Sequence, residues 1–276
     1  MKTHLGKKLA LSLILLSCFG ACLREVPGEP TPEAARQFLK LRGYEYDQPS
    51  FFRAAEAGDA LAVNAFLKAG MNVNVKDSND DTALTAAAAR GDVQMVSTLI
   101  KGGADPNAKG RNNWTALLLS LKEERHEVAE ALLALSNLDL KAETPEGMNA
   151  LMLAVWHQRP DSARKLIQMG SNVNHQDKEG DASLHGAAWV GNMSLLGMLL
   201  DARANPNVKN KLGGTPLMWA ASYGHDAAVR LLLEKGADPR IKDVDGVTAA
   251  GWAAKNKRGN LIMILLAAEK AATGKQ

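Results

Sequence analysis

A period of 33 residues constrains the fold of this chain more than any other feature of its sequence. Seven segments of similar sequence open at Pro49, Thr82, Thr115, Asn149, Ala182, Thr215 and Thr248. Successive openings are 33 residues apart, except for one step of 34 between the third and fourth segments. Such a chain stacks one small unit on the next instead of closing a single globular core.

The unit that opens at Thr215 predicts two short helices. Thr215 can cap the first helix with its hydroxyl, and Pro216 suits the first helical position, where no N–H is needed. Gly224 can adopt the positive φ that ends this helix, and Gly236 ends the second helix. Two helices of this length cannot bury their apolar faces alone, so we expect a stacked copy on each side.

Openings such as TPLM and closings such as KGGADPN and EKGADP resemble the ankyrin repeat. The resemblance covers about Gln48 to Glu269 and places the repeats within residues 48–270. It implies an all-α fold, a solenoid of about seven helix-turn-helix units joined by short β-hairpin fingers. Each unit is expected to touch mainly its neighbours.

Residues 1–22 have the pattern of an export signal peptide. Lys2, Lys7 and Lys8 supply the positive region, and Leu9–Leu16 supply a short apolar run. A single membrane-spanning anchor is the alternative, but it needs roughly 20 apolar residues, which this segment lacks.

Cys18 and Cys22 are the two cysteines of the chain, and both stand in a segment that resembles a bacterial lipoprotein box. Leu15 and Ser17 before Cys18 favour that cysteine slightly. The resemblance implies that one of the two is lipidated and anchors the chain to a membrane. Cleavage without lipidation is the alternative. No aspartate follows either cysteine, which implies a periplasm-facing lipoprotein of the outer membrane.

The segment 23–32 is rich in proline and predicts a flexible tether. Residues 33–47 predict an N-terminal capping helix. Its side chains Phe38, Leu39 and Leu41 could pack on the first repeat. At the other end, the last helix around Leu261–Leu266 has no strongly polar outer side, and residues 271–276 predict a frayed tail.

The third and fourth units depart most from the repeat pattern. Glu124 and Gln158 replace the glycine between the two helices, as Lys257 does in the last unit. The third unit also lacks the closing Gly-Ala-Asp, and Pro160 opens the second helix of the fourth. We therefore predict that the segment from Lys122 to Arg159 is the least stable interior part of the stack.

The sequence contains no pattern typical of an enzyme or a metal site. The six histidines have no metal-ligand spacing, and His185 and His225 occupy positions that are structural in the ankyrin pattern. The net charge of +3 comes from Lys2, Lys7 and Lys8, because removing three of 33 basic residues leaves 30 against 30 acidic ones. No cofactor, nucleic acid or small-molecule substrate is therefore expected.

Aromatic residues are the candidates for a binding site, because such side chains commonly anchor protein interfaces. The five tryptophans fall outside the alanine and leucine positions of the repeat core, and the repeat pattern places them toward the groove or the fingers. Shielding of the edges between neighbouring helices is the alternative role. The candidate protein-binding residues are Trp114, Trp156, His157, Trp189, Trp219, Tyr223 and Trp252.

Together these features predict a non-catalytic scaffold or adaptor of the bacterial cell envelope, which binds a protein partner through its concave groove and fingers. Two related alternatives follow from resemblance: an immunity protein that neutralises a toxin, and a helper of a periplasmic oxidative-stress enzyme. An enzyme is the alternative of another class.

Overall fold

The structure is a computed structural model that describes residues 31–273. The expected signal peptide, with Cys18 and Cys22, and nearly all of the expected tether lie outside the described residues. Residues 31–273 form fifteen α-helices, one short 3-10 helix and no β-strand, which confirms the all-α prediction. The chain divides into two compact units, Met1–Val73 and Asn74–Gln276.

The first unit contains α2 (Pro32–Leu41), α3 (Gln48–Glu56) and α4 (Ala60–Lys68). Thr31 caps α2, because its hydroxyl accepts a hydrogen bond of 3.3 Å from the Ala34 N–H. α2 packs against α4, and Leu39 is fully buried. The expectation that Leu41 also packs inward is wrong: Leu41 is 73% exposed, since residues two apart on a helix point to different sides.

The second unit contains six helix pairs. Their first helices are α5 (Ala83–Arg90), α7 (Ala116–Lys122), α9 (Ala150–Trp156), α11 (Ser183–Val190), α13 (Pro216–Tyr223) and α15 (Ala249–Lys255). Their second helices are α6 (Val93–Lys101), α8 (His126–Leu132), α10 (Pro160–Gln168), α12 (Met193–Asp201), α14 (Asp226–Glu234) and α16 (Gly259–Thr273). A short 3-10 helix, η1 (Arg111–Asn113), precedes α7.

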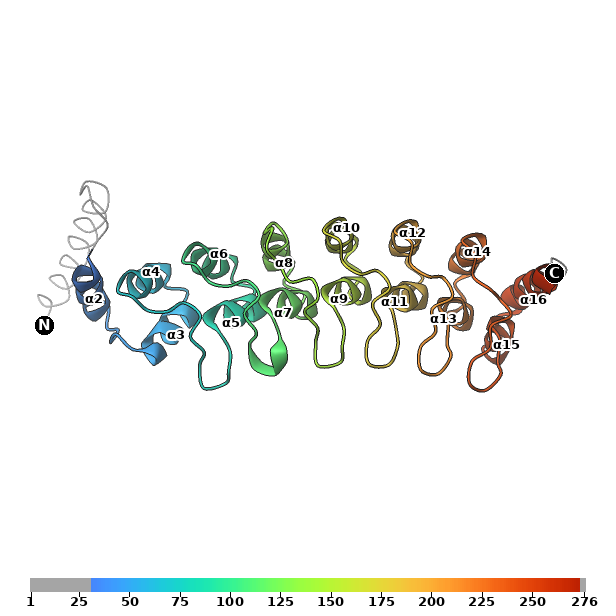
Figure 1. The fold of residues 1–276 in the computed structure, drawn as a ribbon, viewed down its shortest axis with the longest axis horizontal. Helices are drawn as coiled ribbons and strands as arrows, with labels where there is room; N and C mark the ends of the chain where they lie inside the picture. The colour runs from blue at the N-terminus through green and yellow to red at the C-terminus, as the bar shows by residue number, and fades with distance from the viewer. Residues whose placement is uncertain (1–30, 274–276) are drawn as a thin grey trace, which may run out of the picture. The chain divides into compact units, whose positions relative to one another are not determined.

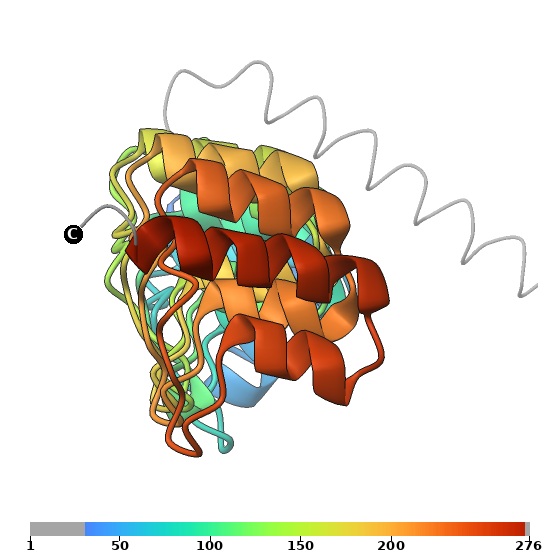
Figure 2. The same ribbon diagram turned by 90° about the vertical axis from the view of Figure 1, so that its right-hand side faces the viewer.

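Within this unit the first helices form one row and the second helices another, while the connecting loops project to one side (Figure 1). Each first helix packs against the next one along the row, from α5 to α15. Figure 2 shows α15 and α16 at the C-terminal end, with the loops of the earlier repeats gathered along one edge. The helix pairs therefore stack as a solenoid, as the repeat period predicts.

The opening residue of most repeats caps the helix that follows it. The side chains of Thr82, Thr115, Asn149, Thr215 and Thr248 each accept a hydrogen bond from a backbone N–H in the first turn. Ala182 has no such side chain, and the ring of His185 accepts the Ala182 N–H instead, at 3.0 Å. The period in the sequence is thus a period of helix starts.

The turn between the two helices of a repeat needs a left-handed residue. Gly91, Gly191 and Gly224 have φ values of 83°, 72° and 82°. Glu124 and Gln158 take the same conformation, with φ of 55° each, although they carry a Cβ. The residues that replace the glycine in the third and fourth repeats therefore keep the left-handed turn, at a cost in backbone strain.

The loops between repeats are hairpin-like fingers without strands. Single antiparallel bridges close three of them: Lys76 with Thr82, Glu143 with Asn149, and Gln176 with Ala182. Neighbouring fingers are joined at their tips, where the N–H groups of Lys178, Lys211 and Val244 donate to the carbonyls of Glu146, Glu179 and Leu212 at 2.9, 2.9 and 3.0 Å. The predicted β-hairpins are too short to form more than these isolated pairs.

The C-terminal helix α16 runs to Thr273, so residues 271–273 of the expected frayed tail are helical. Residues 274–276 lie outside the described part of the chain. Its Leu261 and Leu265 are buried, whereas Met263 is 71% exposed. No helix in residues 31–273 combines the length and the apolar character needed to cross a bilayer.

Candidate protein-binding site

Consecutive first helices bring four aromatic rings together on one face of the second unit. Trp156 ends α9, Trp189 lies in α11, and Trp219 and Tyr223 lie in α13. The ring of Trp156 is 5.0 Å from Trp189 and 6.2 Å from Trp219, and Trp189 is 6.0 Å from Tyr223, between centroids. These four residues form the aromatic cluster. Trp156 and Trp189 occupy equivalent repeat positions, which side-by-side helices place next to each other. Trp219 and Tyr223 reach the same place from other positions of α13.

The members of the aromatic cluster differ in accessibility. Trp189 is 36% exposed and Tyr223 is 50% exposed, whereas Trp156 and Trp219 are half-buried. Nε1 of Trp156 is buried and has no hydrogen-bond partner among the described residues. Gly186 leaves room for this indole, because a Cβ there would lie 3.1 Å from Cε2 of Trp156. Trp156 is therefore the base of the cluster, and Trp189 and Tyr223 are its accessible rim.

Two histidines hold the aromatic cluster in place. Nε2 of His225 lies 2.9 Å from the Trp189 carbonyl oxygen, and its ring stacks on Tyr223 with 6.4 Å between centroids. Nε2 of His185 lies 3.1 Å from the Gly214 carbonyl oxygen, and its ring meets Trp219 edge-on at 5.9 Å. The predicted structural role of His185, a hydrogen bond between neighbouring repeats, is confirmed.

The environment of His185 keeps its ring neutral. Burial lowers the pKa of His185, and the carboxylate of Asp181, 3.8 Å away, offsets only part of this effect. Nδ1 accepts the Ala182 N–H at 3.0 Å and so carries no proton, which assigns the proton to Nε2. Burial likewise raises the pKa of Asp181.

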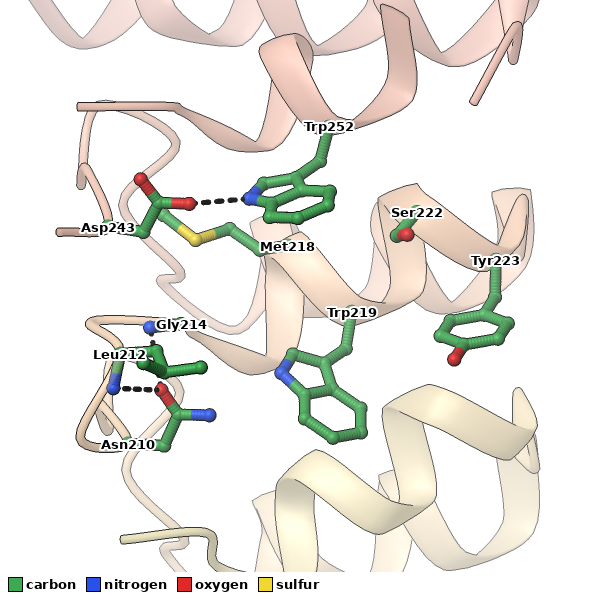
Figure 3. Close-up of a pocket in the computed structure, with 9 residues that line it drawn as sticks. All are labelled: Asn210, Leu212, Gly214, Met218, Trp219, Ser222, Tyr223, Asp243 and Trp252. Carbon is green, nitrogen blue, oxygen red and sulfur yellow. Dashed lines mark hydrogen bonds between the residues drawn. The ribbon is translucent and has the colours of Figure 1, made fainter. Parts of the chain in front are cut away.

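A cavity of about 240 Å³ opens beside the aromatic cluster, between α13, α15 and the last two fingers. Figure 3 shows Trp219 and Trp252 at opposite sides of this hollow, Met218 between them and Tyr223 to one side. It is lined by Asn210, Leu212, Gly214, Met218, Trp219, Ser222, Tyr223, Asp243 and Trp252. Among these residues Asp243 is the one with a charged side chain.

Asp243 is tied to the wall of this cavity. Nε1 of Trp252 donates to its Oδ2 at 2.8 Å (Figure 3), while the N–H groups of Asp245 and Val247 donate to its Oδ1 at 3.0 and 2.8 Å. Desolvation by burial opposes ionisation of Asp243, but the hydrogen bonds from Val247, Trp252 and Asp245 outweigh it and hold its pKa below the usual value. The carboxylate is therefore a fixed negative charge at neutral pH.

Two of the sequence candidates lie apart from the aromatic cluster. Nζ of Lys122 is 4.6 Å from the ring centroid of Trp114, in a separate cavity of about 270 Å³ that Asp81 and Arg111 also line. Nδ1 of His157 lies 3.5 Å from Glu124 Oε1 instead of contacting the aromatic rings. The structure thus joins four candidates in one cluster, links Trp252 to them through the cavity, and separates Trp114 and His157.

Sequence reasoning missed several residues of the cavity, chiefly Leu212, Met218 and Asp243. Leu212 did carry a signal, since it is an apolar residue in a polar fingertip, where it is 68% exposed. Asp243 carried none, because it occupies the turn position that Asp77, Asp177 and Asn210 fill in other fingers. Residues 31–273 hold no group of three or more His, Cys, Asp or Glu side chains placed for one metal ion.

Comparisons with known proteins agree with this architecture. The family model described as ankyrin repeats (3 copies) matches residues 51–144, 103–177 and 184–274. No curated protein sequence matches the chain. The solved ankyrin repeat domain of Bcl-3, described as a unique member of the IkappaB protein family, has a TM-score of 0.65 and 28% identity, over 75% of this chain and 94% of that chain.

An ankyrin repeat domain from Acinetobacter baumannii AYE is also similar, with a TM-score of 0.62 and 25% identity over 67% of this chain and 96% of that chain. The family model covers well over half of the sequence, and the stacked helix pairs have the same fold as both solved domains. The chain belongs to the ankyrin-repeat family.

Proposed function

We propose that this protein is a non-catalytic adaptor whose protein partner docks on the aromatic cluster. Ankyrin repeat domains are general protein–protein interaction scaffolds. The observation that carries the proposal is the shared face of α9, α11 and α13, where Trp189 and Tyr223 are exposed above Trp156.

The packing within the aromatic cluster suits it to binding. Aromatic side chains dominate interface energetics, because they bury a large area and lose little conformational entropy. Here the accessible rings are already fixed by neighbours: Trp189 rests against Trp156, and Tyr223 is stacked on His225. Rings that are ordered before binding lose less freedom when the partner arrives.

The proposal is tested by partner capture with paired variants. We expect Trp189→Ser with Tyr223→Ser to weaken partner binding by about 30-fold, the effect of losing a buried aromatic anchor. Met263→Ser is the matched control, because Met263 is also apolar and exposed but lies on α16, in the row of second helices. The partner is first captured from cell-envelope extract with the unmodified chain, and its affinity for each variant is then measured by calorimetry.

Unchanged circular dichroism and melting temperature in the double variant establish that the stack is intact. Binding that survives the loss of both rings, or is lost in the Met263→Ser control, contradicts docking on the aromatic cluster.

The proposal places the adaptor in the bacterial cell envelope, held to a membrane by a lipid on Cys18 or Cys22. It rests on the lysines and the apolar run of residues 1–22 and on the lipoprotein-like segment around the cysteines. The proline-rich residues 23–32 then serve as a flexible tether between that membrane and the repeats.

Metabolic labelling with a fatty-acid analogue tests this placement. We expect the label on the full chain expressed in bacteria, and its loss in one of the two variants Cys18→Ala and Cys22→Ala. The variant that loses the label should also leave the membrane fraction. An unlabelled full chain recovered as a soluble periplasmic protein supports secretion without lipidation instead.

A further inference from the structure

The cavity between α13, α15 and the last two fingers has aromatic walls. Trp219 and Trp252 lie across from each other, with Tyr223 at the side and Met218 between them (Figure 3). The face of an aromatic ring is the negative end of its quadrupole, so it attracts a cation placed over it. One such contact exists already: Nζ of Lys255 lies 4.8 Å from the ring centroid of Trp252, although Lys255 does not line the cavity.

The residues that line the cavity carry charge of one sign, although Lys255, outside the lining, lies close enough to help lower the pKa of Asp243. Asp243 is the one ionisable carboxylate among the lining residues, and no lysine, arginine or histidine lines the cavity. Two N–H groups occupy its Oδ1 and one occupies its Oδ2. A carboxylate has about four acceptor sites, so one site of Oδ2 is left for a donor from a bound group.

The volume of the cavity and the hydration of the cation together decide which group it can bind. At about 240 Å³ the cavity is smaller than a typical small-molecule site of roughly 300–1,000 Å³, so it suits a single side chain. A guanidinium is planar, weakly hydrated and stacks on aromatic faces, whereas an ammonium is compact and strongly hydrated. We infer that this cavity receives an arginine side chain of the protein partner, with the guanidinium against Trp219 and Trp252 and one N–H donated to Asp243.

A second cavity in the same stack provides an internal control. Trp114 lines it together with Asp81, but Arg111 and Lys122 line it too, and Lys122 already covers the indole at 4.6 Å. Its own cations therefore line that cavity, whereas Lys255, which lies over Trp252, does not line the cavity between Trp219 and Trp252. A cationic probe is expected to leave Trp114 unaffected.

That the arginine belongs to a protein partner rests on the proposed function. The preference of the cavity for arginine can be measured without knowing that partner. The probe is acetyl-arginine amide, added to the full chain labelled with ¹⁵N. The indole N–H signals of Trp219, Trp252 and Trp114 are followed by NMR. Acetyl-citrulline amide is the uncharged probe of the same shape, and acetyl-lysine amide and its trimethylated form are the alternative cations.

We expect saturable shifts of the Trp219 and Trp252 signals with the arginine probe and none at Trp114. Affinity for the citrulline probe should be at least about fivefold lower, because it lacks the cation–π attraction. Shifts of equal size with citrulline, no saturable shift with arginine, or tighter binding of either lysine probe overturns the assignment to arginine.

Two variants test how charged side chains at the cavity contribute to arginine binding. Asp243→Asn should weaken arginine binding by about fivefold or more, since it removes the fixed charge. The turn tolerates this change, because Asn210 holds the equivalent turn by accepting the N–H groups of Leu212 and Gly214 at 3.1 and 2.8 Å. The variant also replaces Oδ2, the acceptor of the Trp252 indole N–H, with an amide donor, so part of its effect comes from this lost hydrogen bond. Lys255→Gln should tighten arginine binding about twofold, because it removes a competing cation beside Trp252.

A gain of affinity cannot come from misfolding, so an unchanged or weaker affinity in Lys255→Gln counts against the inference. If the arginine probe fails while Trp189 and Tyr223 still govern partner capture, the pocket assignment falls and the proposed function stands. If the probe binds but those two residues prove irrelevant to capture, the proposed function falls instead.

Discussion

At the scale of single residues, the turns that follow the helices depend on glycine for two different reasons. Gly191 and Gly236 both have positive φ, 72° and 91°, where any Cβ is strained. A Cβ on Gly191 would also lie 2.6 Å from Cγ of His225, whereas nothing lies within 4 Å of one on Gly236. His225 reaches back across Gly191 to bind the Trp189 carbonyl, so this glycine also makes room for the contact between repeats.

The matched pair Gly191→Ala and Gly236→Ala separates these two costs. We expect Gly236→Ala to lower the free energy of unfolding by about 1 kcal/mol through backbone strain alone. Gly191→Ala should lower it by about 2 kcal/mol or more, because the ring of His225 must also move. Urea denaturation of both variants measures the difference, and equal losses would show that the close approach of His225 carries no cost.

The buried His185 should make stability depend on pH. Its folded pKa lies below 6.5, the usual value of a histidine side chain in water, because burial disfavours the charged ring. Below that pH the unfolded chain therefore binds a proton that the folded chain does not, and the folded state loses stability as the pH falls. Between pH 7 and pH 5 we expect the free energy of unfolding to decrease.

His185→Gln is the control for this pH dependence, because glutamine can accept the Ala182 N–H and donate to the Gly214 carbonyl without titrating. The variant should show a shallower decrease in urea denaturation over the same pH range. An identical slope in both proteins would assign the effect to other groups.

At the scale of elements, the third and fourth repeats are the irregular part of the stack. Neither α8 nor α10 has a side-chain cap, since Arg125 and Arg159 stand at their N-cap positions. In the row of second helices α8 and α10 pack against each other least. Glu130 joins them, because it accepts hydrogen bonds from Ser162 Oγ at 3.0 Å and Lys165 Nζ at 2.8 Å. Such half-exposed polar contacts add little stability.

Hydrogen exchange should therefore find the lowest protection in the interior of the stack between Lys122 and Arg159. Helices without caps and with little apolar contact open more easily than their neighbours. Exchange read by mass spectrometry resolves these segments against α12 and α13, which the side chains of Asn192 and Thr215 cap, as the internal reference. Equal protection throughout Asn74–Gln276 would contradict the prediction.

At the scale of the whole molecule, the second unit is held together by contacts between neighbours. α15 packs on α13, α16 packs on α14, and no described segment covers the exposed side of α16, where Met263 is 71% and Leu266 is 47% exposed. In such a stack stability is close to a sum of units and the interfaces between them. The last repeat protects the apolar faces of α13 and α14.

Removal of residues 248–276 should lower the urea midpoint but leave the remaining repeats folded. The loss comes from the α13–α15 and α14–α16 interfaces, which no other segment replaces. Circular dichroism should show a loss of helix that corresponds to α15 and α16 alone. Complete unfolding of the shortened chain would show that the stack behaves as a single cooperative body instead.

Much of the fold follows from the sequence because its signals are local. The period marks helix starts that Thr82, Thr115 and Thr215 cap, and the residues between paired helices adopt the left-handed conformation whether they are Gly91, Glu124 or Gln158. Each of these features is decided within one turn of the chain, by a side-chain hydroxyl or by the φ of one residue. Local chemistry therefore determined the elements and their order.

The arrangement of the aromatic rings was decided by the tertiary structure alone. The repeat pattern placed the tryptophans toward the groove or the fingers. Packing made Trp156 the base of the aromatic cluster, placed Lys122 over the ring of Trp114, and bonded Trp252 to Asp243. The physical reason is that a repeat position sets which face a residue lies on. The direction of its ring depends on residues about one repeat away, such as Gly186, whose missing side chain leaves the space that Trp156 fills.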